Sequence, residues 1–220
     1  MAINNYSKLL LTFLICANSF LCIAAGNPDG ANIVLPRPQT DKGKPLMQAL
    51  KARKSMRDFG PQKISDQALS DMLWAGFGIN RPETNGRTAP SAINMQEIDE
   101  YVIMEQGLYR YDAKSNVLVW VLGGDLRALA GKQAFVKDAP VNIILVADYS
   151  RIRKIGQNEA KNYAIADAAF ISENIYLYCA SEDLATVVRA SVDKPALAKA
   201  MQLRQDQEII FGQTVGYPKK

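Results

Sequence analysis

Histidine is absent from this chain of 220 residues, and that absence removes several kinds of active site at once. A histidine general base, a Ser-His-Asp or Cys-His nucleophile and any metal site with imidazole ligands are excluded. Charge of one sign is not in large excess either. The 26 basic and 22 acidic residues leave a formal charge of +4, which does not indicate a nucleic-acid partner. If the chain is an enzyme, other groups must supply its chemistry.

Cysteine is also scarce. Two of the three cysteines, Cys16 and Cys22, lie in the first 25 residues, so Cys179 has no intramolecular disulfide partner in the rest of the chain. Cys179 stands in the apolar run 175–180. This position favours a buried structural thiol over a nucleophile, because no histidine is present to activate it.

Charged residues are almost missing from residues 1–25, where Lys8 is followed by the apolar run 9–17 and small residues stand at the end. This order is typical of a signal peptide cleaved near residue 25, and it predicts a periplasmic or secreted protein with no stable membrane insertion afterwards. An uncleaved anchor is the alternative, but Asn18 and Ser19 interrupt the apolar stretch. A lipoprotein anchored through Cys22 fits less well, because bulky residues precede that cysteine.

The rest of the chain divides into an arm and one domain. Residues 26–44 are rich in proline and glycine, which predicts an extended arm, and residues 45–220 are long enough for a single domain with its own core. We expect a polar loop over 76–90. Helices are expected at 45–53, after a Ser65 cap, within 125–137, at 157–181 and at 194–201. Strands are expected at 100–105, 108–111, 116–122, 139–147, 184–191 and 208–217.

The order of these elements predicts the fold class. Helices and strands alternate without a repeated strand-helix-strand rhythm, so we expect an α+β fold with a mixed sheet flanked by helices. The apolar run 139–147 fits a central strand covered on both faces. The helix at 157–181 is small or apolar around most of its circumference. Burial in the core and burial in a dimer interface explain that pattern equally well.

A basic cluster, Arg53, Lys54, Ser55 and Arg57, follows the first predicted helix. Three cations and a hydroxyl within five residues can surround a phosphate. Cations at a helix C-terminus are also common on ordinary exposed surfaces, and spacing alone favours that interpretation. The glycine patterns of nucleotide-triphosphate enzymes and Rossmann dehydrogenases are missing.

Carboxylates also cluster, at Glu97, Asp99 and Glu100, before a predicted strand. Acidic residues beside a loop usually lie at a solvated edge, so we expect them to be exposed and do not interpret them as a catalytic pair.

Several segments, in their order along the chain, resemble the nitroreductase family of FMN-dependent oxidoreductases. Residues 49–59 are similar to the family's opening helix with its Arg-Arg-Ser-x-Arg-x-Phe pattern, and residues 87–96 to its Pro-Ser-x-x-Asn-x-Gln loop. The other matching segments are residues 73–78, 163–177, 183–189 and 215–219. The resemblance implies an exported member of the family: a three-layer α/β/α sandwich with a mixed central sheet, an intertwined homodimer and FMN as cofactor.

The resemblance also implies where the cofactor binds. Arg53, Ser55, Arg57 and Lys219 correspond to positions at the flavin phosphate and ribityl chain, and Lys54 to a position near the polar edge of the ring. Lys54 stands where many members have a second arginine, which keeps the charge but loses the planar fork.

The remaining implied positions lie at the ring itself. Pro90, Ser91 and Asn94 correspond to residues that reach the ring across the dimer interface. Ala185 stands where glycine is usual near flavin N5, and its Cβ hinders a close approach of the backbone there.

No protein residue is implied as catalytic, because a flavin can accept a hydride at N5 and pass electrons on. The implied donor is NAD(P)H or another reductant, and the acceptors are nitroaromatics, quinones or activated alkenes. Free NAD(P)H is not expected outside the cytoplasm, which sets the predicted export against that donor. An exported flavin- or ligand-binding dimer without turnover is the alternative, and a structural envelope protein is a third.

Overall fold

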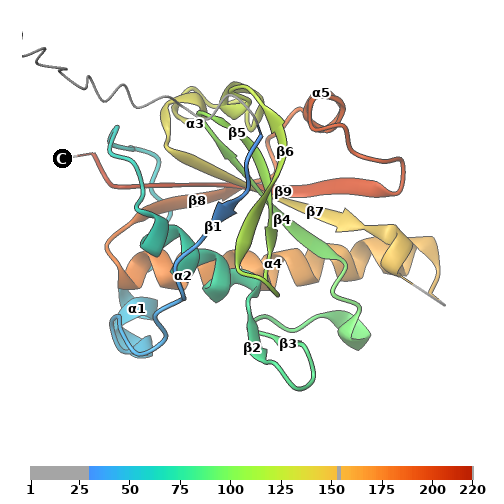
Figure 1. Cartoon of the computed structure of the whole chain (residues 1–220), viewed down its shortest axis with the longest axis horizontal. Helices are drawn as coiled ribbons and strands as arrows, with labels where there is room; N and C mark the ends of the chain where they lie inside the picture. Colours follow the sequence, from blue (N-terminus) through green and yellow to red (C-terminus); the bar gives the residue numbers. More distant parts are fainter. Residues whose placement is uncertain (1–29, 153–154, 220) are drawn as a thin grey trace, which may run out of the picture.

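A seven-stranded sheet forms the centre of the structure, a computed structural model that describes residues 30–152 and 155–219 (Figure 1). The predicted signal segment 1–25 lies outside the described residues. The strand order is β1-β6-β5-β4-β7-β9-β8. The strands are β1 (Ile33–Val34), β4 (Ile98–Met104), β5 (Gly107–Asp112), β6 (Val117–Gly123), β7 (Val141–Asp148), β8 (Ala185–Arg189) and β9 (Gln207–Gly216).

Helices cover both faces of this sheet. The α-helices are α1 (Leu46–Ala52), α2 (Asp66–Phe77), α3 (Phe135–Asp138), α4 (Gln157–Ser181) and α5 (Lys194–Ala200). Single 3₁₀ turns are η1 (Ala92–Asn94), η2 (Arg127–Leu129) and η3 (Tyr149–Arg151). The helices and strands predicted from the sequence are confirmed to within a few residues.

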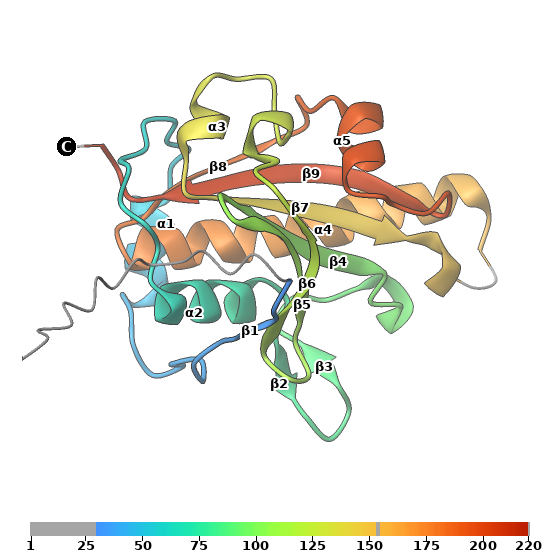
Figure 2. The ribbon, with the colours of Figure 1, turned by 45° about the horizontal axis from the view of Figure 1, so that its top comes forward.

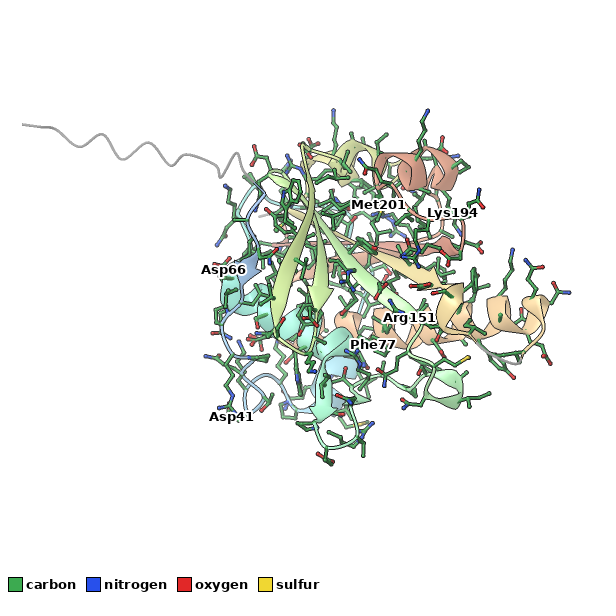
Figure 3. The ribbon with its side chains drawn as sticks, turned by 45° about the vertical axis from the view of Figure 1, so that its right-hand side comes forward. Asp41, Asp66, Phe77, Arg151, Lys194 and Met201 are labelled. Carbon is green, nitrogen blue, oxygen red and sulfur yellow. The ribbon has the colours of Figure 1, made fainter. Side chains whose placement is uncertain are left out.

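The layers are visible in Figure 2, where α1, α2 and α4 lie on one side of the sheet and α3 and α5 on the other. Each side has its own core. One cluster packs Leu73 of α2 and Ile171 of α4 against the sheet, and the other packs Val136 of α3 and Leu197 of α5. Figure 3 shows this separation, with Met201 beyond the end of α5 far from Phe77 of α2. The three-layer α+β class is confirmed.

The direction of the strands differs from the mixed sheet expected. Every pairing in the seven-stranded sheet of the described residues is antiparallel. The connection from β7 through α4 to β8 returns the chain in the same direction, which would give a parallel pair if the strands were neighbours. Instead β9 inserts between them and runs antiparallel to both.

The strand β7 is central, as predicted, and each of its eight residues is buried. The loop expected over 76–90 is wrong in one respect, because it contains a short hairpin of β2 (Ile79–Arg81) and β3 (Gly86–Arg87). A turn in which the Thr84 N–H donates to the Arg81 carbonyl closes this hairpin.

The helix α2 packs closely on α4. Its N-terminus is capped by Ser65, whose hydroxyl oxygen accepts from the Ala68 N–H at 3.2 Å, as the sequence predicts. Near its C-terminus, a Cβ at Gly76 would lie 3.1 Å from Ile175 of α4 and 2.5 Å from the Glu100 carboxylate. Glycine therefore permits the close approach of the two helices here.

Residues 30–44, the described part of the predicted arm, follow the outside of the domain. Ile33 pairs with Leu118 of β6, which makes β1 the edge of the sheet. Further on, Lys42 forms an ion pair with Asp71 of α2 at 2.8 Å, and the Lys44 N–H donates to the Ser181 hydroxyl at the end of α4. These contacts fix the entry of the chain into α1.

The helix α4 is buried on one side and open on the other. Ala164, Ala168 and Ile171 have no exposed surface, whereas Ile165 and Phe170 are each 49% exposed. In residues 30–152 and 155–219, no helix is long and apolar enough to cross a membrane.

Candidate functional site

The basic cluster lies on an extended segment that leaves α1 at Arg53, where the backbone turns away from helical geometry. This segment runs beside the edge strand β8, and the Met56 N–H donates to the Thr186 carbonyl at 2.9 Å. It then meets the end of β9. The Gly60 N–H donates to the Tyr217 carbonyl at 2.8 Å, and the Lys219 N–H donates to the Asp58 carbonyl at 3.1 Å. Lys219 is thereby brought beside the cluster, although it is far away in the sequence.

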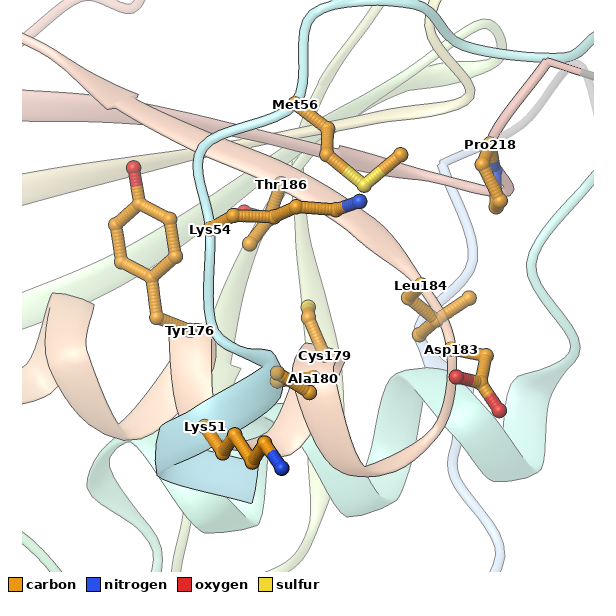
Figure 4. Close-up of a pocket in the computed structure, with 11 residues that line it drawn as sticks. Lys51, Lys54, Met56, Tyr176, Cys179, Ala180, Asp183, Leu184, Thr186 and Pro218 are labelled. Atoms are coloured by element: carbon orange, nitrogen blue, oxygen red, sulfur yellow. The ribbon is translucent and has the colours of Figure 1, made fainter. Parts of the chain in front are cut away.

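A pocket of about 470 Å³ opens beside this segment (Figure 4). In this view the side chain of Lys54 runs below Met56 and across Thr186, while Cys179 and Ala180 of α4 lie lower still. The size is within the range of sites for small organic ligands. Its lining comes from the end of α1, the segment after it, α4 and β8: Lys51, Ala52, Lys54, Met56, Tyr176, Cys179, Ala180, Asp183, Leu184, Thr186 and Pro218.

Tyr176 of α4 fixes the cluster to the sheet. Its hydroxyl oxygen accepts from the Val188 N–H of β8 at 3.0 Å and lies 2.8 Å from the Ser55 hydroxyl. The guanidinium of Arg53 lies over the tyrosine ring, 5.3 Å from its centre. One side chain thus joins the long helix, the edge strand and the basic cluster. Sequence reasoning missed it because a tyrosine in an apolar run gives no sign of such contacts.

We expect Tyr176→Phe to lower the free energy of unfolding by about 2 kcal/mol, because the half-buried Val188 N–H and the Ser55 hydroxyl lose their partner, the hydroxyl of a tyrosine that is only 5% exposed. The measurement is urea denaturation of both proteins without ligand. Tyr163→Phe is the matched control, since that tyrosine on the same helix is 37% exposed. Equal losses in the two variants would contradict the anchoring role of Tyr176.

The cations of the cluster are largely unneutralised. Arg53 approaches Glu173 only at 4.0 Å, and in the part of the chain that the structure describes Lys54, Arg57 and Lys219 form no ion pair. Of these cations Lys54 lines the pocket, whereas Arg53, Arg57 and Lys219 lie on the segments beside it. Positive charge beside a partly apolar pocket suits an anionic ligand.

Cys179 is buried at the floor of the pocket, as the sequence predicts. Burial raises the pKa of the Cys179 thiol, so the group remains a neutral thiol at physiological pH. It contributes packing rather than a nucleophile.

The loop that carries the predicted residues Pro90, Ser91 and Asn94 lies against a different part of α4 from the basic cluster. The Ala92 N–H of this loop donates to the Asp167 carboxylate at 2.9 Å, whereas the basic cluster contacts Tyr176. These two helix positions are nine residues apart, or about 14 Å along the axis. One chain therefore brings Arg53, Lys54, Ser55, Arg57 and Lys219 together, but not the loop.

Ala185 is fully buried and pairs with Gly216 of β9. Its neighbours Leu184 and Thr186 line the pocket, and Ala185 does not. The structure thus places Ala185 next to the pocket and not in its lining.

The three carboxylates expected at a solvated edge are buried, so that expectation is wrong. Asp99 and Glu100 belong to β4, an inner strand, and Glu97 immediately precedes it. Arg151 neutralises Asp99 at 2.6 Å. Burial raises the pKa of Glu100 well above its ordinary value and that of Glu97 to about 7.

Comparisons with known proteins identify relatives of this chain in sequence and in structure. The sequence profile of the nitroreductase family matches residues 50–217. A curated Methanocaldococcus jannaschii protein, named as a nitroreductase, is 28% identical over 152 residues, which cover 64% of this chain and 76% of that protein.

Solved structures agree with this match. A Ralstonia eutropha JMP134 crystal structure, also named as a nitroreductase, is 39% identical, has a TM-score of 0.83 and covers 89% of this chain and 92% of its own. The NADPH:FMN oxidoreductase from Vibrio harveyi complexed with NAD⁺ shares the fold, with 19% identity, a TM-score of 0.59 and coverage of 80% of this chain and 69% of that one.

Proposed function

Because the chain belongs to the nitroreductase family of oxidoreductases, we propose that it is an FMN-dependent enzyme that works as a homodimer. The proposed reaction carries hydride or electrons from a reduced donor, NAD(P)H or another, to a nitroaromatic, quinone or activated-alkene acceptor. The observation that supports it most is the group of largely unneutralised cations beside β8, of which Lys54 lines the pocket and the others lie on the adjoining segments.

The residues present fit FMN. Arg53, Arg57 and Lys219 would hold the phosphate, since guanidinium and ammonium groups bind phosphate oxygens strongly. Ser55 would meet the ribityl chain, and Lys54 would place positive charge at the polar edge of the ring. When bound, the flavin supplies the hydride acceptor that the side chains of this chain lack.

The rest of the pocket would orient the ring and exclude water. Leu184 and Met56 contribute apolar surface to its lining (Figure 4). Thr186 is held by β9, because its hydroxyl donates to the Thr214 carbonyl at 2.9 Å. Tyr176 keeps the basic cluster in place, so the cations are positioned before the ligand arrives, which reduces the cost of ordering them.

The dimer is proposed from the exposed side of α4 and from the separated loop. Apolar side chains of Ile165 and Phe170 are half exposed on α4. A second copy packed on this side would cover them and bring its own Ser91 and Asn94 toward the pocket. Without that copy, the loop and the cluster remain about 14 Å apart along α4.

We further propose that residues 1–25 direct export to the periplasm or outside the cell. There the donor would be a quinol or another reductant rather than free NAD(P)H. The pocket beside β8 is compatible with either, because the donor would bind on the ring and not in the cationic rim.

Absorbance and reduction test the proposed function. Purified mature protein should be yellow or become so with added FMN, and anaerobic NADPH, NADH or a quinol should bleach it. A nitroaromatic or a quinone should then restore the colour. Protein that binds no FMN would overturn the proposal, and bound FMN that no donor reduces would favour the binder without turnover.

A further inference from the structure

The loop of residues 90–97 is folded back on itself against α4. Its interior is closed by the Gln96 N–H, which donates to the Ser91 hydroxyl at 3.0 Å. Ile93 and Asn94 adopt left-handed backbone angles, with φ of 54° and 56°. This tight turn places both the Ala92 N–H and the Glu97 side chain at Asp167.

Glu97 is an unusual residue at this place. It is 0% exposed, and in the described residues neither of its carboxylate oxygens has a well-formed hydrogen-bond partner. Its own backbone N–H lies close enough to oppose the effect of burial on its pKa. The group it meets is the carboxyl of Asp167, which is also buried. Two adjacent buried carboxylates are stable only if they share a proton, which then supplies the missing hydrogen bond.

The surrounding charges do not replace that proton. The charge of Arg151 of η3 acts to lower the pKa of Glu97, but Arg151 donates to the Gln96 carbonyl at 2.9 Å and to Asp99 at 2.6 Å. Arg151 also lies 3.4 Å from Asp148. Its charge is therefore already shared by two other carboxylates.

The other neighbours add no free positive charge. Tyr149 of η3 donates its hydroxyl to Glu208 of β9 at 2.9 Å, and Lys161 of α4 lies 3.7 Å from the same carboxylate. Burial and the like charge of its neighbour raise the pKa of Glu97, and burial raises that of Asp167.

We propose that Glu97 and Asp167 are positioning residues that share one proton, and that this proton holds the loop carrying Ser91 and Asn94 in place to reach the flavin of a second subunit. The inference rests on the proposed function, because the loop acts on a bound flavin only in that dimer. Asp167 holds the loop directly through the Ala92 N–H, and Glu97 holds it through Asp167.

The direction of the pH effect follows from the raised pKa of Glu97. In the unfolded chain the carboxyl loses its proton near its ordinary pKa of about 4.5, whereas in the folded protein it keeps the proton up to a pKa of about 7. Its contribution to loop stability is complete at low pH and is lost as the pH rises toward and beyond 7. Above that pH two buried negative charges face each other, and the loop detaches from α4.

Conservative variants test this proposal in the full-length dimer. In Glu97→Gln the amide donates permanently to Asp167, and in Asp167→Asn the amide donates to Glu97 while its oxygen still accepts from the Ala92 N–H. Glu159→Gln changes an exposed carboxylate on the same helix and is the control. FMN affinity by fluorescence quenching and deuterium exchange of peptides covering 90–97 without FMN are measured at pH 6 and pH 8.

In the parent protein and the control, we expect loop protection and FMN affinity to fall about tenfold from pH 6 to pH 8. A tenfold change in an equilibrium constant corresponds to a difference of one unit in the pKa of the proton that is linked to it. Both amide variants should abolish most of this change. Titration of the FMN phosphate itself affects every protein equally and cancels in the comparison. Asp167→Ala should leave the loop poorly protected at both pH values.

The outcomes separate this proposal from the proposed function. A parent protein and a Glu97→Gln variant with the same pH dependence of loop protection would overturn the shared proton. Loop protection that behaves as expected in protein that binds no FMN would overturn the flavin role while leaving the carboxyl pair intact.

Discussion

Arg57→Ala should weaken FMN binding about 100-fold and leave riboflavin binding almost unchanged. The guanidinium of Arg57 is exposed beside the pocket and forms no ion pair in the described residues, so its proposed partner is the phosphate that riboflavin lacks. A charge-assisted pair of hydrogen bonds contributes about 2–3 kcal/mol, which corresponds to that change in affinity. Fluorescence quenching of each flavin gives both dissociation constants.

Lys199→Ala is the control for this experiment, because it removes an exposed cation from α5 on the other side of the sheet. Its FMN affinity should match that of the parent. If Arg57→Ala weakens both flavins equally, the residue acts on the pocket as a whole. If it weakens neither, the phosphate is not bound at the cluster.

Arg189→Ala should lower the free energy of unfolding by about 3 kcal/mol, the largest loss of stability that we expect from one substitution. Arg189 of β8 is only 6% exposed and donates to the Ala130 carbonyl, the Asn142 amide oxygen and the Thr214 hydroxyl. Truncation leaves a cavity and removes all three bonds, and the Ala130 carbonyl then has no donor from this side chain. Urea denaturation measures the loss.

Arg189→Met separates packing from hydrogen bonding. Methionine refills much of the volume without any donor and also removes a buried charge, so we expect about half the loss of the alanine variant. Lys132→Ala, at an exposed cation, should leave stability near that of the parent. A methionine variant as unstable as the alanine variant would mean that the hydrogen bonds, and not the cavity, dominate.

The elements could be predicted where their signals are local. The Ser65 cap and the apolar spacing after it mark α2, and the continuous apolar run marks β7. The antiparallel sheet could not be predicted, because the insertion of β9 between β7 and β8 depends on pairings between distant segments. The hairpin of β2 and β3 was missed because its strands are short, polar and held by a turn.

The same distinction applies to the candidate site. The basic cluster is visible as charges close together in the sequence, and the resemblance assigned them a role. The partners that position them are distant: Ser55 meets Tyr176 across 121 residues, and Ala92 meets Asp167 across 75. Nothing in the local sequence around Glu97 or Asp167 predicts their contact. Each has the pattern of a solvent-exposed carboxylate, and only the fold shows that both are buried.

The hydrogen bonds from the segment after α1 also protect the protein against aggregation. β8 is an edge strand, and its outward Thr186 carbonyl and Val188 N–H are occupied by the Met56 N–H and the Tyr176 hydroxyl. An open edge is a template on which another chain can add a strand and aggregate. The segment proposed to bind the ligand therefore also covers this edge of the sheet. Substitutions that loosen it should cost solubility as well as affinity.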